Sequence, residues 1–277
     1  PTGVDDSGEA ALSNKFFISE TEVTNSIMAA VLQWAYDNAK LSSGLGETTR
    51  VVYKNQMLLK LDEPDSKIVT DGYGAFSVTS GFENHPVIHV TWYGAIMFCN
   101  WLTEMIDGNS ENVVYSGISE TWVHDDVVVD DSKTGFRLPS SIEWGFTARY
   151  IDGSNWNYGD HVSGDLSGYC YDDGSPLGDD PVLSEEFAQY AWYDGNSNSS
   201  GEFLLQQVKL KKANHLGIFD MSGNAFEWVY TKGSGDNRLW RGGSFAMNAA
   251  FLRLGHEHYN AATYQNSSLG LRLAKTK

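Results

Sequence analysis

The spacing of hydrophobic residues predicts two long helices in the first half of the chain. Apolar side chains recur every three or four residues over 25–36 and again over 92–105, as on the buried face of an amphipathic helix. Thr24 and Thr91 directly precede these stretches, and a threonine hydroxyl can accept a hydrogen bond from the first turn of a helix. We expect the first helix to pack through three residues on one face: Ile27, Val31 and Trp34.

Short apolar runs between turn-forming residues predict strands at 16–18, 57–61, 68–71 and 127–129. A third helix should begin after Ser140 and end at Tyr150. Glu143 follows Ser140 by three residues, and these two side chains can cap the start of a helix reciprocally.

Stretches 152–180 and 194–202 are rich in Gly, Asp, Asn and Ser, which predicts irregular structure on the surface. No linker, internal repeat or low-complexity tract interrupts the chain. A chain of 277 residues can bury about 75% of its unfolded surface in one core. We therefore expect a single α+β domain, loop-rich, over 16–277, preceded by a polar segment over 1–15.

Charge restricts the partners of this protein. Its 19 Lys and Arg against 36 Asp and Glu give a formal net charge of −17 at pH 7. Such a surface repels phosphate backbones, so nucleic acid is excluded as a partner, and it disfavours adsorption to anionic lipid. No apolar run approaches the roughly 20 residues that span a bilayer. We expect a soluble monomer with no transmembrane segment.

The two cysteines, Cys99 and Cys170, are too few for a disulfide framework and do not decide the compartment. Cys99 falls in the second predicted helix, which favours a small buried side chain. Cys170 falls in a loop, which favours a thiol without a functional role. The chain begins at Pro1 without an apolar signal segment, which favours a mature chain whose upstream signal or anchor has been removed.

The most unusual stretch lies near the C-terminus, between a Trp-Arg-Gly-Gly-Ser motif at 240–244 and Leu-Gly-Leu-Arg-Leu-Ala at 269–274. Between them, 245–268 is rich in Ala, Asn, Tyr, His and Ser and has only two charged residues, Arg253 and Glu257, in a chain that is 20% charged. It has neither the period of a helix nor the alternation of a strand. Such composition is typical of a binding surface rather than a core.

The motifs of the chain, taken in order, resemble the formylglycine-generating-enzyme (sulfatase-modifying factor) family. They are Glu22 to Asn25, His85 to Trp92, Phe136 to Ser140 with Glu143-Trp144, Ala191 to Tyr193, Leu216 to Asn224 with Glu227-Trp228, Arg241 to Ser244, and Leu269 to Arg272. The resemblance implies a variant of the C-type lectin fold, with two main helices on a twisted mixed sheet and long loops.

The oxidases of that family use two cysteines placed a few residues after the Gly-Gly-Ser motif. In this sequence the corresponding positions hold Met247 and Leu252, which supply no thiolate for copper or for thiol oxidation. The resemblance therefore implies a protein that is not an enzyme. An oxidase of the same superfamily with divergent chemistry is the alternative.

A second branch of the family comprises the variable proteins of diversity-generating retroelements, including those of Treponema. Its ligand site is a variable region between a Trp-Arg-Gly-Gly-Ser-like entry and a Leu-Gly-Phe-Arg-like exit, and this chain has both motifs. The resemblance implies a variable region at about 245–268 that is diversified to display a changeable binding surface. It also implies a lipoprotein anchored at the cell surface, with an unknown protein or cell-surface ligand as partner. A non-diversified interaction module is a further alternative.

Retroelements of this branch substitute adenines, chiefly in AAC codons, which cannot then encode Lys, Met, Gln, Glu or Trp. The ligand-binding candidates that fit this restriction are Ala246, Asn248, Ala250, Phe251, His256, His258, Tyr259, Asn260, Ala261, Tyr264, Asn266 and Ser267. Met247, Glu257 and Gln265 do not fit, so either other codons supply them or they mark a departure from this branch.

No cofactor is required in this interpretation, but relatives bind calcium around a Gly-Asn-x-x-Glu segment. The resemblance makes Asn224 and Glu227 candidate Ca²⁺ ligands through their oxygen atoms. The alternative is a helix that begins at Asn224 and is capped by this pair. His256 and His258 have the spacing of a metal pair on a strand, but no third ligand is evident beyond Glu257, which would point the other way, and variable surface positions explain them better.

The residues that frame the tail have expected structural roles. Gly242 and Gly243 should adopt positive φ or permit close backbone approach, and Arg241 and Arg272 should form buried ion pairs with loop carboxylates. We place three tryptophans in the core: Trp92, Trp144 and Trp228.

Overall fold

The computed structural model describes residues 12, 15–41, 48–118, 127–153, 155–167, 184–199 and 201–277. Its three longer helices are α1 (Asn25–Asp37), α2 (Trp92–Asp107) and α3 (Ser141–Arg149). Three short helical turns follow: α4 (Phe187–Tyr190), α5 (Asp194–Ser197) and the 3₁₀ turn η3 (Ala249–Leu252). Much of the remaining chain is irregular, as predicted for a loop-rich α+β protein.

The strands form several small sheets rather than one large sheet. The central sheet has the order β13 (His258–Ala261), β12 (Asn237–Arg241), β11 (Phe226–Lys232), β14 (Leu269–Leu271). It is mixed, because β11 and β14 run parallel and the other pairs are antiparallel. A three-stranded sheet joins both ends of the domain: β1 (Phe16–Ile18), β15 (Ala274–Thr276) and β8 (Phe136–Arg137).

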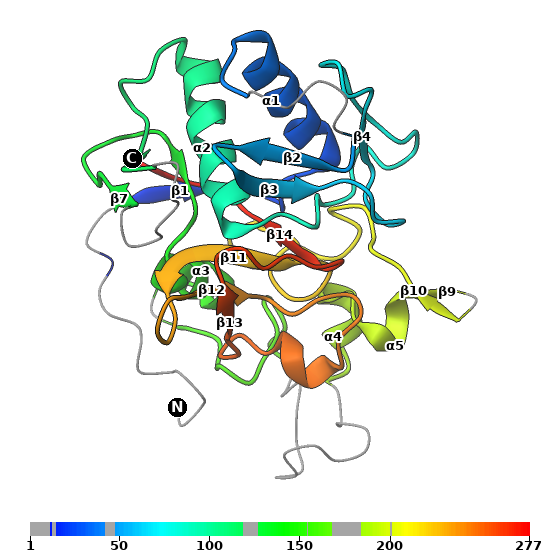
Figure 1. The fold of residues 1–277 in the computed structure, drawn as a ribbon. Coiled ribbons are helices and arrows are strands. Elements are labelled where there is room, and N and C mark those ends of the chain that lie inside the picture. Colours follow the sequence, from blue (N-terminus) through cyan, green and yellow to red (C-terminus); the bar gives the residue numbers. More distant parts are fainter. Residues whose placement is uncertain are drawn as a thin grey trace.

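Four two-stranded ladders complete the described strands. They are β2 (Arg50–Tyr53) with β3 (Gln56–Lys60), β4 (Ile68–Thr70) with β5 (Phe76–Val78), β6 (Tyr115–Ser116) with β7 (Val128–Val129), and β9 (Asn198–Ser199) with β10 (Glu202–Phe203). In Figure 1, α1 lies above β2 and β3, α2 runs down beside these two strands, and the central sheet lies below β3.

The helix starts agree with the sequence analysis. The Thr91 hydroxyl accepts from the Gly94 N–H at 3.0 Å, the Thr24 hydroxyl accepts more weakly from Ile27 at 3.5 Å, and Ser140 forms the predicted capping box. The predicted face of α1 is partly wrong, because Ile27 is 43% exposed. The buried face is formed by Met28, Val31, Leu32 and Ala35. At the start of α1, apolar and small residues follow one another directly, so their spacing alone does not determine which face of the helix is buried.

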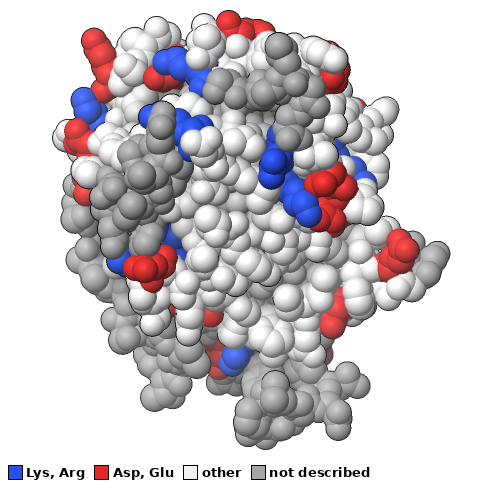
Figure 2. Space-filling view, viewed as in Figure 1, with Lys and Arg blue, Asp and Glu red and all other residues white. Residues whose placement is uncertain are grey.

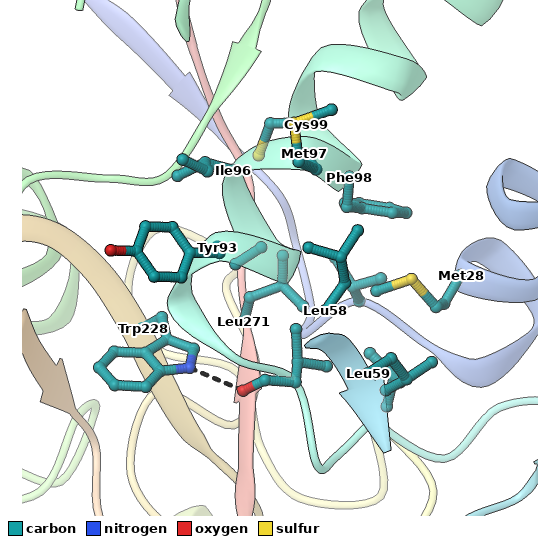
Figure 3. Packing of buried hydrophobic residues seen from close by; sticks show 14 of the residues in the cluster. Met28, Leu58, Leu59, Tyr93, Ile96, Met97, Phe98, Cys99, Trp228 and Leu271 are labelled. Atoms are coloured by element: carbon teal, nitrogen blue, oxygen red, sulfur yellow. Dashed lines mark hydrogen bonds between the residues drawn. The ribbon is translucent and has the colours of Figure 1, made fainter. Parts of the chain in front are cut away.

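Helix α2 is the centre of the main hydrophobic core. Figure 3 shows its Tyr93, Ile96 and Phe98 packed among residues from α1, β3 and the central sheet. Gly94 allows this close packing, because a Cβ there would lie 2.1 Å from the Leu58 carbonyl oxygen. The Trp228 indole of β11 donates to the Val90 carbonyl at 2.9 Å, which joins the central sheet to the start of α2. All three tryptophans assigned to the core are fully buried.

The stretch after Asp152 is only partly on the surface. Asn157, Val162 and Asp165 are buried. The Asn157 amide donates to the carbonyls of Val162 and Asp165 at 3.1 and 2.9 Å. The prediction of a surface excursion is therefore wrong for this part. The remainder of that excursion beyond 167, Cys170, and nearly all of the predicted segment 1–15 lie outside the described residues.

Candidate functional site

The tail enters its site through a tight turn after β12. Gly242 and Gly243 have φ of 99° and 75°, as predicted for glycines in this motif. A Cβ on Gly243 would lie 2.7 Å from the Leu252 side chain, so this turn and the following 3₁₀ turn are in direct contact. Glycine is required here by both the backbone conformation and the space.

The burial of the tail divides its residues into two groups. All twelve ligand-binding candidates are exposed or half-buried, with Ala246, Asn248, Tyr259, Ala261 and Ser267 fully at the surface. The buried residues of the interval 245–268 are Phe245, Ala249, Leu252, Leu254, Gly255, Ala262 and Ser268, none of which is a candidate. The tail therefore supplies part of the core and, between those positions, a continuous set of accessible side chains.

Met247, the first tail residue that AAC-type codons cannot encode, is held in place by the rest of the fold. Its side chain packs against two hydrophobic clusters, the main core and the smaller cluster around Phe187 and Leu252. Its carbonyl also accepts from the Asp194 N–H at 3.1 Å. Leu252, the second position at which the family has a cysteine, is completely buried.

Glu257 is held by a buried polar network. It forms an ion pair with Arg241, and the Ser141 hydroxyl donates to the same carboxylate oxygen at 2.7 Å. Arg241 also donates to the Leu254 carbonyl at 2.6 Å and lies over the Trp144 ring at 4.9 Å. This network confirms the ion pair predicted for Arg241 and ties the centre of the tail to α3.

Gln265 is held by a buried histidine. His89 lies 2.7 Å from the Gln265 side-chain oxygen through Nδ1 and 2.7 Å from Asp65 through Nε2. Its backbone N–H donates to the Asn266 carbonyl at 3.0 Å, and its own φ is 61°, which is unusual for a histidine. A surface hollow of about 480 Å³ lies beside these groups, with Ser267 on its wall.

Trp240 is the floor of an aromatic cluster on the tail. Tyr264 stacks on its indole with ring centroids 5.3 Å apart and 17° between the planes. His258, its cross-strand neighbour on β13, lies 6.1 Å away at 16°. His256 extends the cluster, 4.4 Å from His258 and 5.2 Å from Phe251. Trp240 is buried, whereas the four tail rings around it are half-buried.

The two histidines are uncharged at neutral pH. Burial lowers the pKa of His256 to about 4, assisted by the neighbouring His258, and burial also lowers the pKa of His258. Their rings lie side by side, as alternate spacing predicted, while Glu257 between them turns toward Arg241. Over the described ranges, no three His, Cys, Asp or Glu side chains gather as a group that could hold a metal ion.

Glu227, a candidate calcium ligand, is completely buried in an ion pair with Arg272, whose Nη2 lies 2.8 Å from Oε1. The Trp144 indole donates to the other carboxylate oxygen at 2.7 Å. These contacts do not fit a calcium site, because a guanidinium already neutralises this carboxylate. They confirm the ion pair predicted for Arg272, although its partner lies in strand β11 and not in a loop.

Asn224, the other candidate, is also occupied by protein groups. Its side chain donates to the Glu22 carboxylate at 3.1 Å and accepts from the Gln206 N–H at 3.0 Å. The helix-capping alternative is wrong, because Asn224 has φ of 56° and is followed by strand β11, which pairs on both sides.

Glu22 and Asp220 lie near the Arg272 guanidinium, which already pairs with Glu227. The three carboxyl groups outnumber its single positive charge. Burial raises the pKa of Glu22 well above its usual range, and the neighbouring Asp220 raises it further against the opposing effect of Arg272. Burial raises the pKa of Asp220 to about 6. This buried cluster therefore binds protons more tightly in the folded state than in the unfolded chain.

Several residues of the site have no signal in the sequence. Ser141 and His89 contact the tail, and Asp65 contacts His89, from positions that are far from the tail along the chain, so no local pattern connects them. Thr263, in contrast, is exposed and belongs to the AAC-type set. It could have been included with the twelve candidates on composition alone.

No thiol is available at the family's two cysteine positions. Cys99 lies inside α2 in the main core, and burial raises the pKa of its thiol far above its usual range. No helix in the described part of the chain is long and apolar enough to cross a membrane.

The chain is similar to several known proteins over most of its length. The family model of the Sulfatase-modifying factor enzyme 1-like domain matches residues 7–277. Chaperone protein LppX of Paenibacillus barcinonensis is 28% identical over 223 residues, which cover 72% of this chain and 73% of that protein. The formylglycine-generating enzyme of Streptomyces coelicolor is 22% identical over 296 residues, covering 94% of this chain and 77% of the enzyme. In the solved structure of Treponema denticola variable protein 1, 84% of that chain aligns with 95% of this one, with a TM-score of 0.61 and 24% identity.

Proposed function

Since the chain belongs to the family of sulfatase-modifying factor enzyme 1-like domains and has their variant of the C-type lectin fold, we propose that it is a non-enzymatic member that binds a ligand through residues 245–268. In this proposal the tail is diversified by a retroelement, and the rest of the molecule is a constant scaffold. Fold alone does not assign function, so the proposal depends on the chemistry of the tail.

The observation that carries the proposal is the division of the tail into accessible and anchored residues. The twelve candidate positions all face solvent at least in part. The three that AAC-type codons cannot supply, Met247, Glu257 and Gln265, each contact the scaffold through packing, an ion pair or a hydrogen bond. Diversification is compatible with this arrangement, because solvent can accommodate a changed side chain at most of these positions; Phe251 and Tyr264 are the candidates that also pack against the buried clusters.

A substitution library tests this division directly. We expect NNC codons to be tolerated at the twelve candidate positions, with most variants as resistant to protease as the parent protein. The matched control places Ala, Asn or Ser at Met247, Glu257 and Gln265, where we expect resistance to fall. Equal tolerance in both groups would contradict the proposed division of roles.

The retroelement part of the proposal has its own genetic test. We expect the locus to contain a second, nearly identical copy of the tail that differs only at adenines, close to a reverse-transcriptase gene. A locus without this repeat, together with an invariant tail among sister isolates, would leave a non-diversified interaction module.

An oxidase with divergent chemistry is the competing function. Met247 and Leu252 are a thioether and a fully buried alkyl group, which supports a protein without the family's thiol chemistry. We expect no bound copper or iron in the purified protein and no oxygen consumption with thiol peptides. Metal-dependent oxygen uptake would establish the oxidase instead.

We further propose that the protein is displayed at the cell surface as a lipid-anchored monomer, which would bring its tail to external partners. The similarity to variable proteins motivates this placement. Labelling of intact cells with an antibody against the tail should detect the protein, and size-exclusion chromatography should show a single chain.

A further inference from the structure

The accessible surface of the tail has few charged groups, half-buried Arg253 and Glu257, although the protein has a net charge of −17. None of the twelve candidate residues is Asp, Glu, Lys or Arg. Of the two charged residues in the interval, Glu257 is paired with Arg241, and Arg253 donates to the Ala250 carbonyl at 2.7 Å. Figure 2 shows the same contrast: the region over β11–β13 is mostly white, and charged residues lie above it and toward the margins.

What this surface presents instead is aromatic rings and amides. The rings of Phe251, His256, His258 and Tyr264 form one connected group over Trp240. Asn266 adds an amide group beside the Tyr264 hydroxyl, 3.3 Å away, while Tyr259 is 54% exposed on the other face of β13. Such a surface can bind apolar and aromatic side chains together with neutral hydrogen-bonding groups.

The same surface contains a sheet edge. β13 is the outermost strand of the central sheet, and among the described strands only β12 pairs with it. Edge strands are usually protected from other chains by lysine, proline or a charged residue. The four residues of β13, His-Tyr-Asn-Ala, include none of these.

We infer that the tail surface binds an extended, uncharged peptide segment of a protein partner, which adds to β13 as a further strand and places aromatic side chains on the ring cluster. The inference rests on the proposed binding function and specifies its partner. A peptide supplies both features that this surface can use: main-chain groups for the sheet edge and alternate side chains for the rings. An oligosaccharide could stack on the rings but has no main chain to continue the sheet.

Carboxylates near the tail surface lead to a competing expectation about the peptide that it binds. Asp65 lies beside the tail through His89, and Asp160 follows Gly159, whose carbonyl accepts from the Gly255 N–H at 2.7 Å. If these groups and the overall charge governed binding, a peptide rich in Lys and Arg would be preferred. The two expectations differ in the composition of the bound peptide and in its response to salt.

Selection from a random peptide display library on the intact protein distinguishes them. We expect enriched peptides to be low in charge and rich in aromatic and β-branched residues, and their affinity to change less than about twofold between 50 and 500 mM salt, because few charges are screened. The double variant His258→Asn with Tyr264→Asn should bind the selected peptides with an affinity lower by roughly tenfold or more, an effect typical of losing central aromatic contacts. Tyr73→Asn is the matched control, since Tyr73 is 70% exposed on the β4–β5 turn, and should change nothing.

Strand addition has a specific signature in the selected peptide. N-methylation at successive residues should abolish binding at every second position only, because alternate N–H groups of an added strand face the sheet. Loss at no position, or at every position, would overturn the strand model. Circular dichroism of the two tail variants, unchanged from the parent, would show that the fold is retained.

Other outcomes separate this inference from the function beneath it. Two results would overturn the inference but not the proposed function, provided that the tail variants still abolish binding. One is the selection of peptides rich in Lys and Arg, and the other is binding to a glycan array without binding to peptides. Peptide and glycan binding that never depends on the tail would overturn the proposed function as well.

Discussion

Three residues, Met247, Glu257 and Gln265, explain how a tail with an accessible surface stays in place. Each lies between accessible positions and contacts a different part of the scaffold: the cores, Arg241 of β12, and His89 before α2. Their side chains therefore act as fixed points, together with the buried Leu252, Leu254 and Ala262 of the same stretch. This separation of roles is a property of individual residues and can be tested one residue at a time.

Glu257→Gln should destabilise the fold by about 2 kcal/mol, because it removes the charge that neutralises the buried Arg241 guanidinium. Urea unfolding followed by tryptophan fluorescence measures the change. Ser267→Ala, at an exposed tail position, is the control and should change stability by less than about 0.5 kcal/mol. If both variants unfold at the same urea concentration, Glu257 does not anchor the tail.

At the scale of elements, the central sheet is held in the molecule by a buried charge cluster. Arg272, just after β14, reaches Glu227 on β11, and it also donates to the carbonyls of Ser19 and Phe219 at 2.9 and 2.7 Å. One guanidinium thus joins the exit of β1, the loop before β11 and the end of the central sheet. The cost of this arrangement is an excess of buried carboxylates, including Asp220.

Asp220→Asn should stabilise the protein at pH 8 by about 2 kcal/mol, and the difference should shrink toward pH 5. The pKa of Asp220 is raised to about 6 in the folded state, so the folded state holds an extra proton from about pH 4 to 6. Stability supplied by that proton is present at low pH and is lost as the pH rises through 6. Asparagine mimics the protonated form and tolerates the left-handed backbone at this position (φ 56°).

Unfolding free energies at pH 5, 6.5 and 8 for both proteins check this prediction. Comparing the two chains at each pH cancels the opposite contribution of His256, whose lowered pKa removes stability as the pH falls below 6.5. A gap between variant and parent that is independent of pH would show that Asp220 does not titrate in this range.

For the whole molecule, the structure favours stability without bound calcium. Asn224 and Glu227 are occupied by protein groups, and over the described ranges no three His, Cys, Asp or Glu side chains gather as a group that could hold an ion. The oxygens that were candidate ligands neutralise or orient protein groups instead.

Calcium at 5 mM, or an excess of EDTA, should therefore leave the melting temperature unchanged within about 1 °C, because a ligand that does not bind the native state does not stabilise it. Differential scanning calorimetry in the two solutions makes the measurement, with magnesium as a control for ionic strength. A rise in melting temperature with calcium alone, saturating with concentration, would contradict the absence of a site at Asn224 and Glu227.

Much of this protein is encoded in short stretches of its sequence. The threonine caps, the Ser140–Glu143 capping box and the positive-φ glycines 242 and 243 depend on neighbouring residues, and the structure confirms each of them. The ordered motifs also identified the family and its fold. Composition selected the tail, and its twelve candidates and Met247, Glu257 and Gln265 all reach the surface at least in part.

Tertiary structure decided how those residues are used. The Gln265–His89 contact joins positions 176 residues apart, and Ser141–Glu257 joins positions 116 apart. Asn224 and Glu227 have the local pattern of a helix start, but pairing with β12 and β14 made the following residues a strand. Contacts between distant segments contribute more free energy than local capping preferences, and no periodicity along the chain records which distant segments will meet.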